Sequence, residues 1–163
     1  MKQIVFPLIA VAIFISLVGI LSNRGFSFKN SSLDTNSYST IEIADKKLEV
    51  EVANTNEDRK KGLSDRDSLD EGSGMLFAFG QENVTPSFWM KNMKFSIDII
   101  WIDDDTVVGF VKDVKPQGGV GDNGLNLYTP EVKIDYVLEV NSGFVEKNNI
   151  SPGDPVKITF KNN

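Results

Sequence analysis

The sequence predicts a mainly β domain, a compact sandwich or partly closed barrel with two short helices, preceded by one N-terminal transmembrane helix. Three observations support this fold class. Short runs of alternating apolar and polar residues recur from Tyr38 onwards, turn-forming residues separate these runs, and an uncharged apolar run stands near the start of the chain. At 163 residues and 40% hydrophobic content, the chain has room for one ordinary domain and an appendage.

The apolar run, residues 4–21, contains 18 residues without a charge. As a helix rising about 1.5 Å per residue, that length spans a hydrocarbon core of about 30 Å. The alternative is a cleaved signal peptide, which would normally have a shorter apolar region and a small-x-small cleavage pair that residues 19–23 lack. We therefore expect residues 1–21 to be a membrane anchor, with a signal peptide and secretion as the alternative.

Residues 22–37 are rich in Ser, Asn and Gly and predict a flexible tether that leads to a domain over residues 38–163. Lys2 precedes the apolar run, whereas Arg24 and Lys29 follow it, so the distribution of positive charge barely discriminates between the two orientations. The simplest arrangement is a single-pass membrane protein with a short N-terminal tail and a domain that faces outside the cytoplasm.

The first half of the domain begins with a hairpin, because residues 40–44 and 48–52 both alternate about a short polar turn. Thr55 or Asn56 then has the side chain to cap a short helix that ends near Gly62. Residues 75–79 are apolar at every position, which is typical of a central strand.

The stretch over residues 87–102 holds both tryptophans and places one acid, Asp98, in an otherwise apolar run. If residues 88–92 form a strand, Trp89 and Lys91 share one face and the side chains between them face the core. This stretch is where we expect a functional site.

The second half of the domain continues the same pattern. We expect strands at residues 97–102, 107–111, 132–140 and 156–160, a short helical turn at 144–149, and a long loop at 116–130. The run Asp103–Asp105 lacks the ligand spacing of a calcium-binding loop and predicts a hairpin turn. The glycines of the long loop lack the residues of a phosphate-binding loop and favour a mobile lid or spacer.

Composition excludes several kinds of chemistry. The chain has no Cys and no His, which removes disulfides, cysteine nucleophiles, Ser-His-Asp triads and ordinary zinc sites. We expect no metal and no cofactor; a metal would have to be an oxygen-ligated ion. The net charge is −6, and it becomes −9 from Asp34 onwards because only three charged residues, all basic, precede that position. Such an acidic domain is an unlikely partner for nucleic acid.

Asp98 is the leading candidate for a site, because a lone carboxylate in an apolar run must be paired, neutralised or used. It could act as a base, a ligand or a recognition group. The alternative is a structural acid held by backbone amides and one Arg or Lys. As catalytic candidates, Glu139 and then Lys91 follow Asp98.

The candidate ligand-binding residues are Arg59, Arg66, Trp89, Lys91, Asn92 and Asp98. Arg59 and Arg66 lie seven residues apart, about two turns of a continuous helix, and could together bind a carboxylate or phosphate. They could equally pair with the acids Asp98 or Glu139, or lie on the surface. Trp89 and Lys91 could line a groove that stacks a ring or a sugar, although burial of the tryptophan is the alternative.

Five short motifs follow one another along the chain. They are Arg59-x-x-Gly62-Leu63-x-x-Arg66, Gly74-Met75-Leu76-Phe77-x-Phe79, Phe88-Trp89-Met90-Lys91-Asn92 with Asp98 six residues on, Val137-Leu138-Glu139 and Gly153-Asp154. In this order they resemble the family known as domain of unknown function 192, over about residues 41–160. The resemblance implies a compact, mostly β fold with short helices, in bacteria and archaea, often behind a membrane or export segment.

The resemblance implies an architecture and site candidates but no reaction, because the family has no established activity. Three places depart from the family pattern: Ser64 stands where Met is usual, Met93 where Thr is usual, and Ser96-Ile97 where Pro-Leu commonly precedes the acid. Met93 matters most, since the missing hydroxyl removes one polar partner from any site beside Lys91 and Asn92.

Together these observations predict a non-catalytic binding or accessory module of the cell envelope. Its groove near Trp89, Lys91 and Asp98 would hold a small polar, saccharide-like or peptide ligand. One alternative is a histidine-free hydrolase or transferase that uses Asp98 with Glu139 or Lys91. Another is a purely structural envelope protein.

Overall fold

The structure, a computed structural model, describes residues 38–161. The expected membrane anchor over residues 1–21 and the expected tether over residues 22–37 lie outside the described residues. The described residues belong to one compact unit. In the described range, no helix has the length and apolar character needed to cross a membrane.

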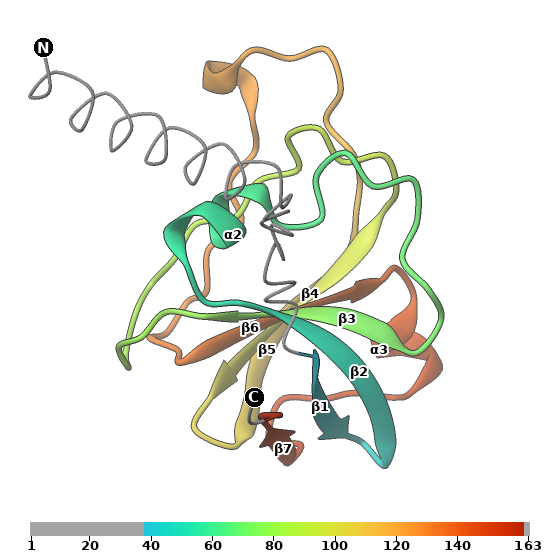
Figure 1. The fold of residues 1–163 in the computed structure, drawn as a ribbon, viewed down its shortest axis with the longest axis vertical. Coiled ribbons are helices and arrows are strands. Elements are labelled where there is room, and N and C mark those ends of the chain that lie inside the picture. The colour runs from blue at the N-terminus through green and yellow to red at the C-terminus, as the bar shows by residue number, and fades with distance from the viewer. Residues whose placement is uncertain (1–37, 162–163) are drawn as a thin grey trace, which may run out of the picture. The chain divides into compact units, whose positions relative to one another are not determined.

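The described part of the chain contains a single seven-stranded sheet (Figure 1). Its elements are β1 (Tyr38–Ile43), β2 (Lys46–Ala53), α2 (Asn56–Lys61), β3 (Ser73–Ala78), β4 (Ile97–Asp103), β5 (Thr106–Val114), the 3₁₀ turn η1 (Asp122–Gly124), β6 (Tyr136–Asn141), α3 (Phe144–Lys147) and β7 (Val156–Thr159). The strand order is β5-β4-β6-β3-β2-β1-β7, and β2 and β3 pair in parallel whereas the other neighbours are antiparallel. The predicted mainly β fold with two short helices is confirmed.

The sheet curls until its two edge strands meet at one end. Thr106 at the start of β5 forms an isolated bridge with Pro155, immediately before β7. The Val107 amide donates to the Asp154 carbonyl at 2.9 Å, and the Val107 carbonyl accepts from the Gly153 amide at 2.8 Å. Of the two predicted forms, the structure is therefore the partly closed barrel, a curled half-barrel, because one sheet folds over itself.

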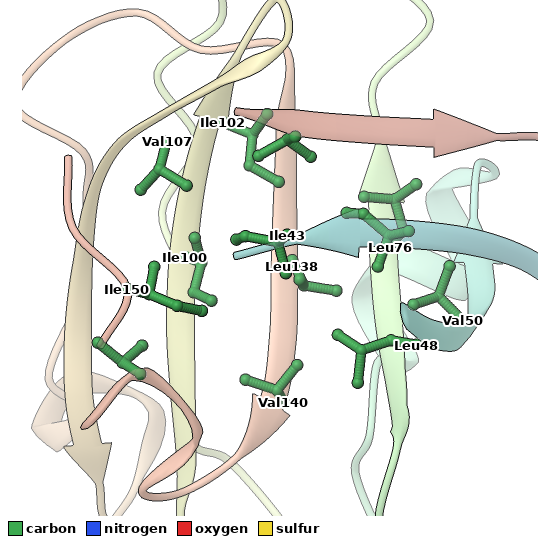
Figure 2. Packing of buried hydrophobic residues seen from close by; sticks show 13 residues of the cluster. Ile43, Leu48, Val50, Leu76, Ile100, Ile102, Val107, Leu138, Val140 and Ile150 are labelled. Atoms are coloured by element: carbon green, nitrogen blue, oxygen red, sulfur yellow. The ribbon is translucent and has the colours of Figure 1, made fainter. Parts of the chain in front are cut away.

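The concave face of the half-barrel holds the larger apolar cluster. Because side chains alternate along a strand, every second residue points inward from each strand (Figure 2). The buried residues of this cluster are Ile41, Ile43, Leu48, Val50, Leu76, Ile100, Ile102, Val107, Leu138, Val140, Val145, Ile150 and Val156. Val145 comes from α3, so this short helix packs into the half-barrel.

The convex face, which we call the outer face, carries a second apolar cluster. Its strand residues are Ala53, Met75, Phe77, Ile97, Ile99, Trp101, Val114 and Val137, and Leu63, Met90, Met93 and Ile134 cover them from the connecting segments. Strand β4 is consequently buried on both faces. The segments that cover the outer face are the ones that build the candidate site.

Most local predictions are confirmed. The first hairpin forms, and Thr55 caps α2 because its hydroxyl oxygen accepts a hydrogen bond from the Asp58 amide at 3.1 Å. Gly62 ends this helix with a φ of 50°, a conformation that favours glycine. Strand β3 is central, between β6 and β2, as its continuous apolar run predicted.

Two strand predictions are wrong in their extent. Residues 88–92 do not join the sheet: Phe88 makes only an isolated bridge with Tyr128, and Asn92 has a φ of 57°. The segment instead crosses the outer face, with Met90 1% exposed and Trp89 40% exposed. The predicted strand over residues 132–140 begins only at Tyr136, because the preceding segment bridges to Val84 rather than to a neighbouring strand.

Asp98 lies on the concave face and is completely buried. One carboxylate oxygen accepts a hydrogen bond from the Asp113 amide of β5 at 2.8 Å, and the other accepts from the Val145 amide of α3 at 2.9 Å. Within residues 38–161, no Lys or Arg pairs with this carboxylate. The side chain therefore connects β4 to a neighbouring strand and to the helix that packs inside the half-barrel.

Replacing Asp98 with Asn should destabilise the domain by about 2 to 4 kcal/mol, because the amide nitrogen of Asn would face a buried backbone N–H that loses its acceptor. Urea unfolding of residues 38–163 near neutral pH measures this change. The matched control is Asp70→Asn, an exposed position where we expect a change within about 0.5 kcal/mol. Equal stability of the two variants would contradict a structural role for Asp98.

Candidate functional site

The candidate site lies over the outer face, where three connecting segments come together (Figure 1). They are residues 54–72, which include α2, residues 79–96 and residues 115–135. The Asp65 amide donates to the Asn92 carbonyl at 2.9 Å, which joins the first two segments. The bridge between Phe88 and Tyr128 joins the second and the third. Two adjoining pockets lie among these segments.

The first pocket, which we call the Glu139 pocket, has a volume of about 310 Å³. Among the described residues that line it, Glu139, from β6, is the only acid. Aromatic rings form much of the lining, and α2 contributes basic side chains. The full lining is Asn56, Arg59, Lys60, Lys61, Gly62, Leu63, Ser64, Phe77, Phe79, Pro86, Ser87, Phe88, Trp89, Met93 and Glu139.

Glu139 is buried without a hydrogen-bond partner. Its side chain is 5% exposed, and no described residue donates to its carboxyl group. The other two buried acids among residues 38–161 each accept from two backbone amides: Asp98 as described above, and Asp135 from Asn83 at 2.9 Å and Asp104 at 3.0 Å. Glu139 is thus the one buried acid of the described domain that receives no hydrogen bond from another described residue. Its carboxyl oxygens are not completely enclosed, because no fully buried side-chain oxygen among residues 38–161 lacks a partner, and they face the pocket.

Burial raises the pKa of Glu139 from its ordinary 4.5 to about 8. The register of the sheet explains why nothing opposes this effect, since the residues paired with Glu139 are Met75 on β3 and Ile99 on β4, both apolar. Near neutral pH the carboxyl group of the empty pocket therefore carries a proton. It can act as a hydrogen-bond donor or give up that proton when a positive charge arrives.

The aromatic walls are held by their own packing. Phe77 and Phe88 meet edge to face, with ring centroids 4.9 Å apart and planes at 87°. The ring centroids of Phe88 and Trp101 are 5.8 Å apart. Trp89 is 40% exposed at the mouth. An ordered aromatic wall beside a small number of polar groups is typical of a small-molecule site.

The guanidinium of Arg59 is already occupied. It donates to the carbonyls of Asn54 and Ala78 at 2.7 and 2.6 Å and to the side chain of Asn56 at 2.7 Å, and it lies 5.7 Å from the ring centroid of Phe79. These bonds tie α2 to the end of β3. Arg59 consequently shapes the mouth of the pocket more than it offers free donors.

The second pocket adjoins the first across Trp89, which lines both, and has a volume of about 560 Å³. An exposed ion pair crosses it, in which the ammonium of Lys91 contacts the carboxylate of Asp122 in the long loop. Asn92 also lines it, and Leu127 is 62% exposed at its edge. Three residues of the predicted groove, Trp89, Lys91 and Asn92, line this larger pocket, whereas the fourth, Asp98, does not.

The structure brings some predicted site residues together and separates others. Arg59, Trp89 and Glu139 line one pocket. Arg66 lies apart from them, because its guanidinium binds both carboxylate oxygens of Glu51 on β2. The helix ends at Lys61, so the two arginines do not continue on one helical face.

Asp98 and Glu139 lie on opposite faces of the sheet. Ile99, the neighbour of Asp98, pairs with Glu139, so alternation directs the two carboxyl groups away from each other. They cannot act on one reacting atom. Lys91 pairs with Asp122 and does not line the Glu139 pocket.

The sequence interpretation missed the aromatic lining of the pocket, Phe77 and Phe79, which it took only as part of a buried strand. The spacing of two residues between Met75 and Phe77 predicts that both lie on one face of the strand, but only the pairing of Met75 with Glu139 in the structure shows that Glu139 shares this face. Met93, the position where the resemblance leads us to expect a hydroxyl, also lines this pocket. A thioether there leaves the carboxyl group with apolar surroundings.

The acidic run Asp103–Asp105 lies at the turn between β4 and β5, as predicted. Across residues 38–161, no group of three or more acidic side chains is arranged to hold a metal ion. The pocket itself contains a single carboxyl group, so its chemistry comes from Glu139 and the aromatic rings.

Fold and pocket together define a small half-barrel domain with an aromatic-lined site over one buried carboxyl group. The family DUF192, described as an uncharacterised ACR, matches residues 39–158, and the chain belongs to this family. No curated protein matches the chain.

Several solved structures are similar to this chain, among them two bacterial proteins. A protein from Sinorhizobium meliloti 1021, provisionally described as a transcription regulator, is 27% identical with a TM-score of 0.68, and the match covers 76% of this chain and 95% of that one. A protein of unknown function from Novosphingobium aromaticivorans DSM 12444 is 26% identical with a TM-score of 0.64, covering 74% and 83% of the two chains. Neither description assigns a ligand.

The raised pKa of Glu139 should make stability depend on pH. Between pH 4.5 and about 8 the unfolded chain releases a proton that the folded domain retains, so the free energy of unfolding falls as pH rises and levels off above this window. Glu139→Gln should remove this decrease, on the order of 4 kcal/mol, and be more stable than wild type at pH 8. Urea titrations of residues 38–163 at pH 5 and pH 8 measure both effects.

The matched control is Glu49→Gln, an exposed position on the same outer face of the sheet that does not line the pocket. It should keep the wild-type dependence on pH. If Glu139→Gln also keeps that dependence, the carboxyl group titrates normally and our description of the pocket floor is wrong.

Proposed function

We propose that this domain is a ligand-binding module of the cell envelope and that its ligand enters the Glu139 pocket. The observation that carries the proposal is a carboxyl group that is 5% exposed, lines a pocket and has no partner among the described residues. The carboxyl oxygens of Glu139 are not completely enclosed, so a molecule that enters the pocket can reach them. A ligand with a polar group could form the hydrogen bonds that the described residues do not supply and that water otherwise would.

The surroundings of Glu139 support a small ligand. A pocket of about 310 Å³ is at the small end of ordinary ligand sites. Aromatic rings provide apolar contact, and Trp89 at the mouth leads to the second pocket, where a longer ligand could continue toward Lys91 and Asn92. A saccharide or a peptide segment that enters with one end would suit this arrangement.

Nucleic acid is the less suitable partner. Residues 38–161 carry 14 basic and 22 acidic side chains, a net charge of −8, which repels a phosphate backbone. The relative from Sinorhizobium meliloti is provisionally described as a transcription regulator. The charge of this chain favours a different role.

An enzyme remains the second candidate, since a carboxyl group with a pKa of about 8 is protonated near neutral pH and could act as a general acid. Asp98 would not assist it, because that residue faces the opposite side of the sheet. The other charged residues that line the pocket are the basic residues Arg59, Lys60 and Lys61, and the described residues of its lining include no second carboxyl group. Turnover that Glu139→Gln abolishes would favour this candidate over simple binding.

We further propose that residues 4–21 anchor the domain to the membrane and that it faces outside the cytoplasm. The 18 uncharged residues of that run support anchoring. In that position the domain would meet ligands of the envelope.

Ligand binding should depend on Trp89. We expect one or more members of a panel of amines, amino acids, monosaccharides and tripeptides to raise the melting temperature of the full chain. Trp89→Ala should weaken that binding about 10- to 100-fold, because the aromatic wall at the mouth is lost. Val132→Ala, another exposed apolar position that lines neither pocket, should leave it unchanged.

The panel can also contradict the proposal. If no compound shifts the melting temperature of the wild type at millimolar concentration, or if Val132→Ala and Trp89→Ala weaken binding equally, the Glu139 pocket is not the ligand site.

Membrane anchoring predicts that the full chain remains in the membrane fraction after alkaline carbonate extraction, whereas residues 22–163 expressed with a cleavable export signal appear in the soluble fraction. Protease added to intact cells, from which any outer membrane and cell wall have been removed, should digest the domain. Release of the full chain by carbonate, with a shortened N-terminus by mass spectrometry, would instead support a cleaved signal peptide.

A further inference from the structure

The Glu139 pocket favours one class of ligand, provided that it binds a ligand as proposed above. Its carboxyl group has apolar neighbours on both sides in the sheet, Met75 and Ile99, and receives no hydrogen bond from the described residues. When this carboxyl group is ionised, it offers two acceptor oxygens to which no described residue donates. A complementary ligand brings the donors itself.

The walls of the pocket favour a positive charge. Phe77, Phe88 and Trp89 line it, and the faces of aromatic rings attract cations. The edge-to-face contact between Phe77 and Phe88 fixes these rings at a centroid distance of 4.9 Å. An ammonium group that lies beside both the carboxyl group and the rings would be stabilised by electrostatic attraction to each.

No residue in the described part of the chain neutralises Glu139. Arg59 is bound to two carbonyls and to Asn56, Lys60 is exposed, and Glu51 on the same outer face is paired with Arg66. Lys61, also exposed, completes the charged residues that line the pocket. Burial is the cause that raises the pKa of Glu139, and no protein cation counteracts it. A cationic ligand could therefore be the counter-ion of Glu139.

We propose that the pocket binds a primary ammonium group carried on a short apolar stem, with the –NH₃⁺ group donating hydrogen bonds to Glu139 and the stem packed against Phe88 and Trp89. The volume of about 310 Å³, roughly that of ten liquid waters, suits a stem of a few carbons such as the end of a lysine-like side chain. The net charge of −8 over residues 38–161 attracts such cations from a distance.

Binding releases one proton. The protonated carboxyl group of the empty pocket loses H⁺ to solvent, and the resulting carboxylate pairs with the arriving R–NH₃⁺, which stays protonated throughout. Affinity should therefore increase with pH, by up to tenfold per unit below about pH 8, and become constant above it. Alkylammonium groups keep their charge over this range, because the pKa of such an amine is about 10.4.

The test compares three probes that share a stem: n-pentylammonium, 1-pentanol and hexanoate. Isothermal titration calorimetry of the full chain in a non-ionic detergent measures each at pH 6 and pH 8. We expect pentylammonium to bind at least tenfold more tightly than 1-pentanol at pH 8, and hexanoate to bind most weakly. Titrations in phosphate and in HEPES should report release of about one proton at pH 7.

Two variants distinguish the ionic contact from general packing. Glu139→Gln keeps the size of the side chain and should abolish the preference for pentylammonium over 1-pentanol, together with proton release. Trp89→Leu keeps an apolar wall and should weaken pentylammonium binding several-fold more than 1-pentanol binding. Glu49→Gln, at an exposed position on the same face, should behave as wild type.

Failure of this inference differs from failure of the proposed function. If 1-pentanol or hexanoate binds as tightly as pentylammonium, or if Glu139→Gln keeps the preference, the pocket binds ligands but not through an ammonium group. If all three probes fail while another panel compound binds in a Trp89-dependent way, the ammonium class is wrong and the binding function stands. If nothing in the panel binds, both are wrong.

Discussion

The constraint on which the rest of this structure depends is that one sheet must bury both of its faces. Strand β4 is buried at all but its last position, so neither face of the central sheet can meet water. The concave face is buried because the sheet curls until β5 and the start of β7 meet, with α3 packed inside. The outer face has no second sheet, and the segments between strands must cover it. A pocket forms where that irregular cover is incomplete, over Glu139.

The three buried acids of the described domain differ in whether backbone amides donate hydrogen bonds to them. Asp98 and Asp135 each receive two backbone amides, and each joins segments that lie far apart in the sequence. Such carboxylates stabilise the fold because their partners are fixed and buried with them. Glu139 receives none, and burial raises its pKa to about 8, which lowers the stability of the empty domain near neutral pH. A residue that opposes folding in this way is where a functional role is most readily sought.

Membership in DUF192 and the similarity to two solved structures identify a family without identifying an activity. The physical description of the pocket therefore has to stand on the residues of this chain. The predicted groove near Trp89, Lys91 and Asp98 is divided by the structure, because Asp98 lies on the opposite face of the sheet from Glu139 and Trp89 lines both pockets of the outer face. Arg66 and Asp98 become parts of the scaffold, since each is bound to other protein groups.

The sequence by itself determined the mainly β class, the first hairpin, the Thr55 cap and the inward and outward alternation of Met90 and Trp89. These follow from local periodicity and from capping, which depend on near neighbours. Only the tertiary structure decided which acid is satisfied and which is exposed to a pocket. Asp98 and Glu139 both appear in the sequence as single acids in apolar strands. Their difference arises from amides and rings contributed by distant segments, namely Asp113 and α3 for one and the aromatic cover for the other.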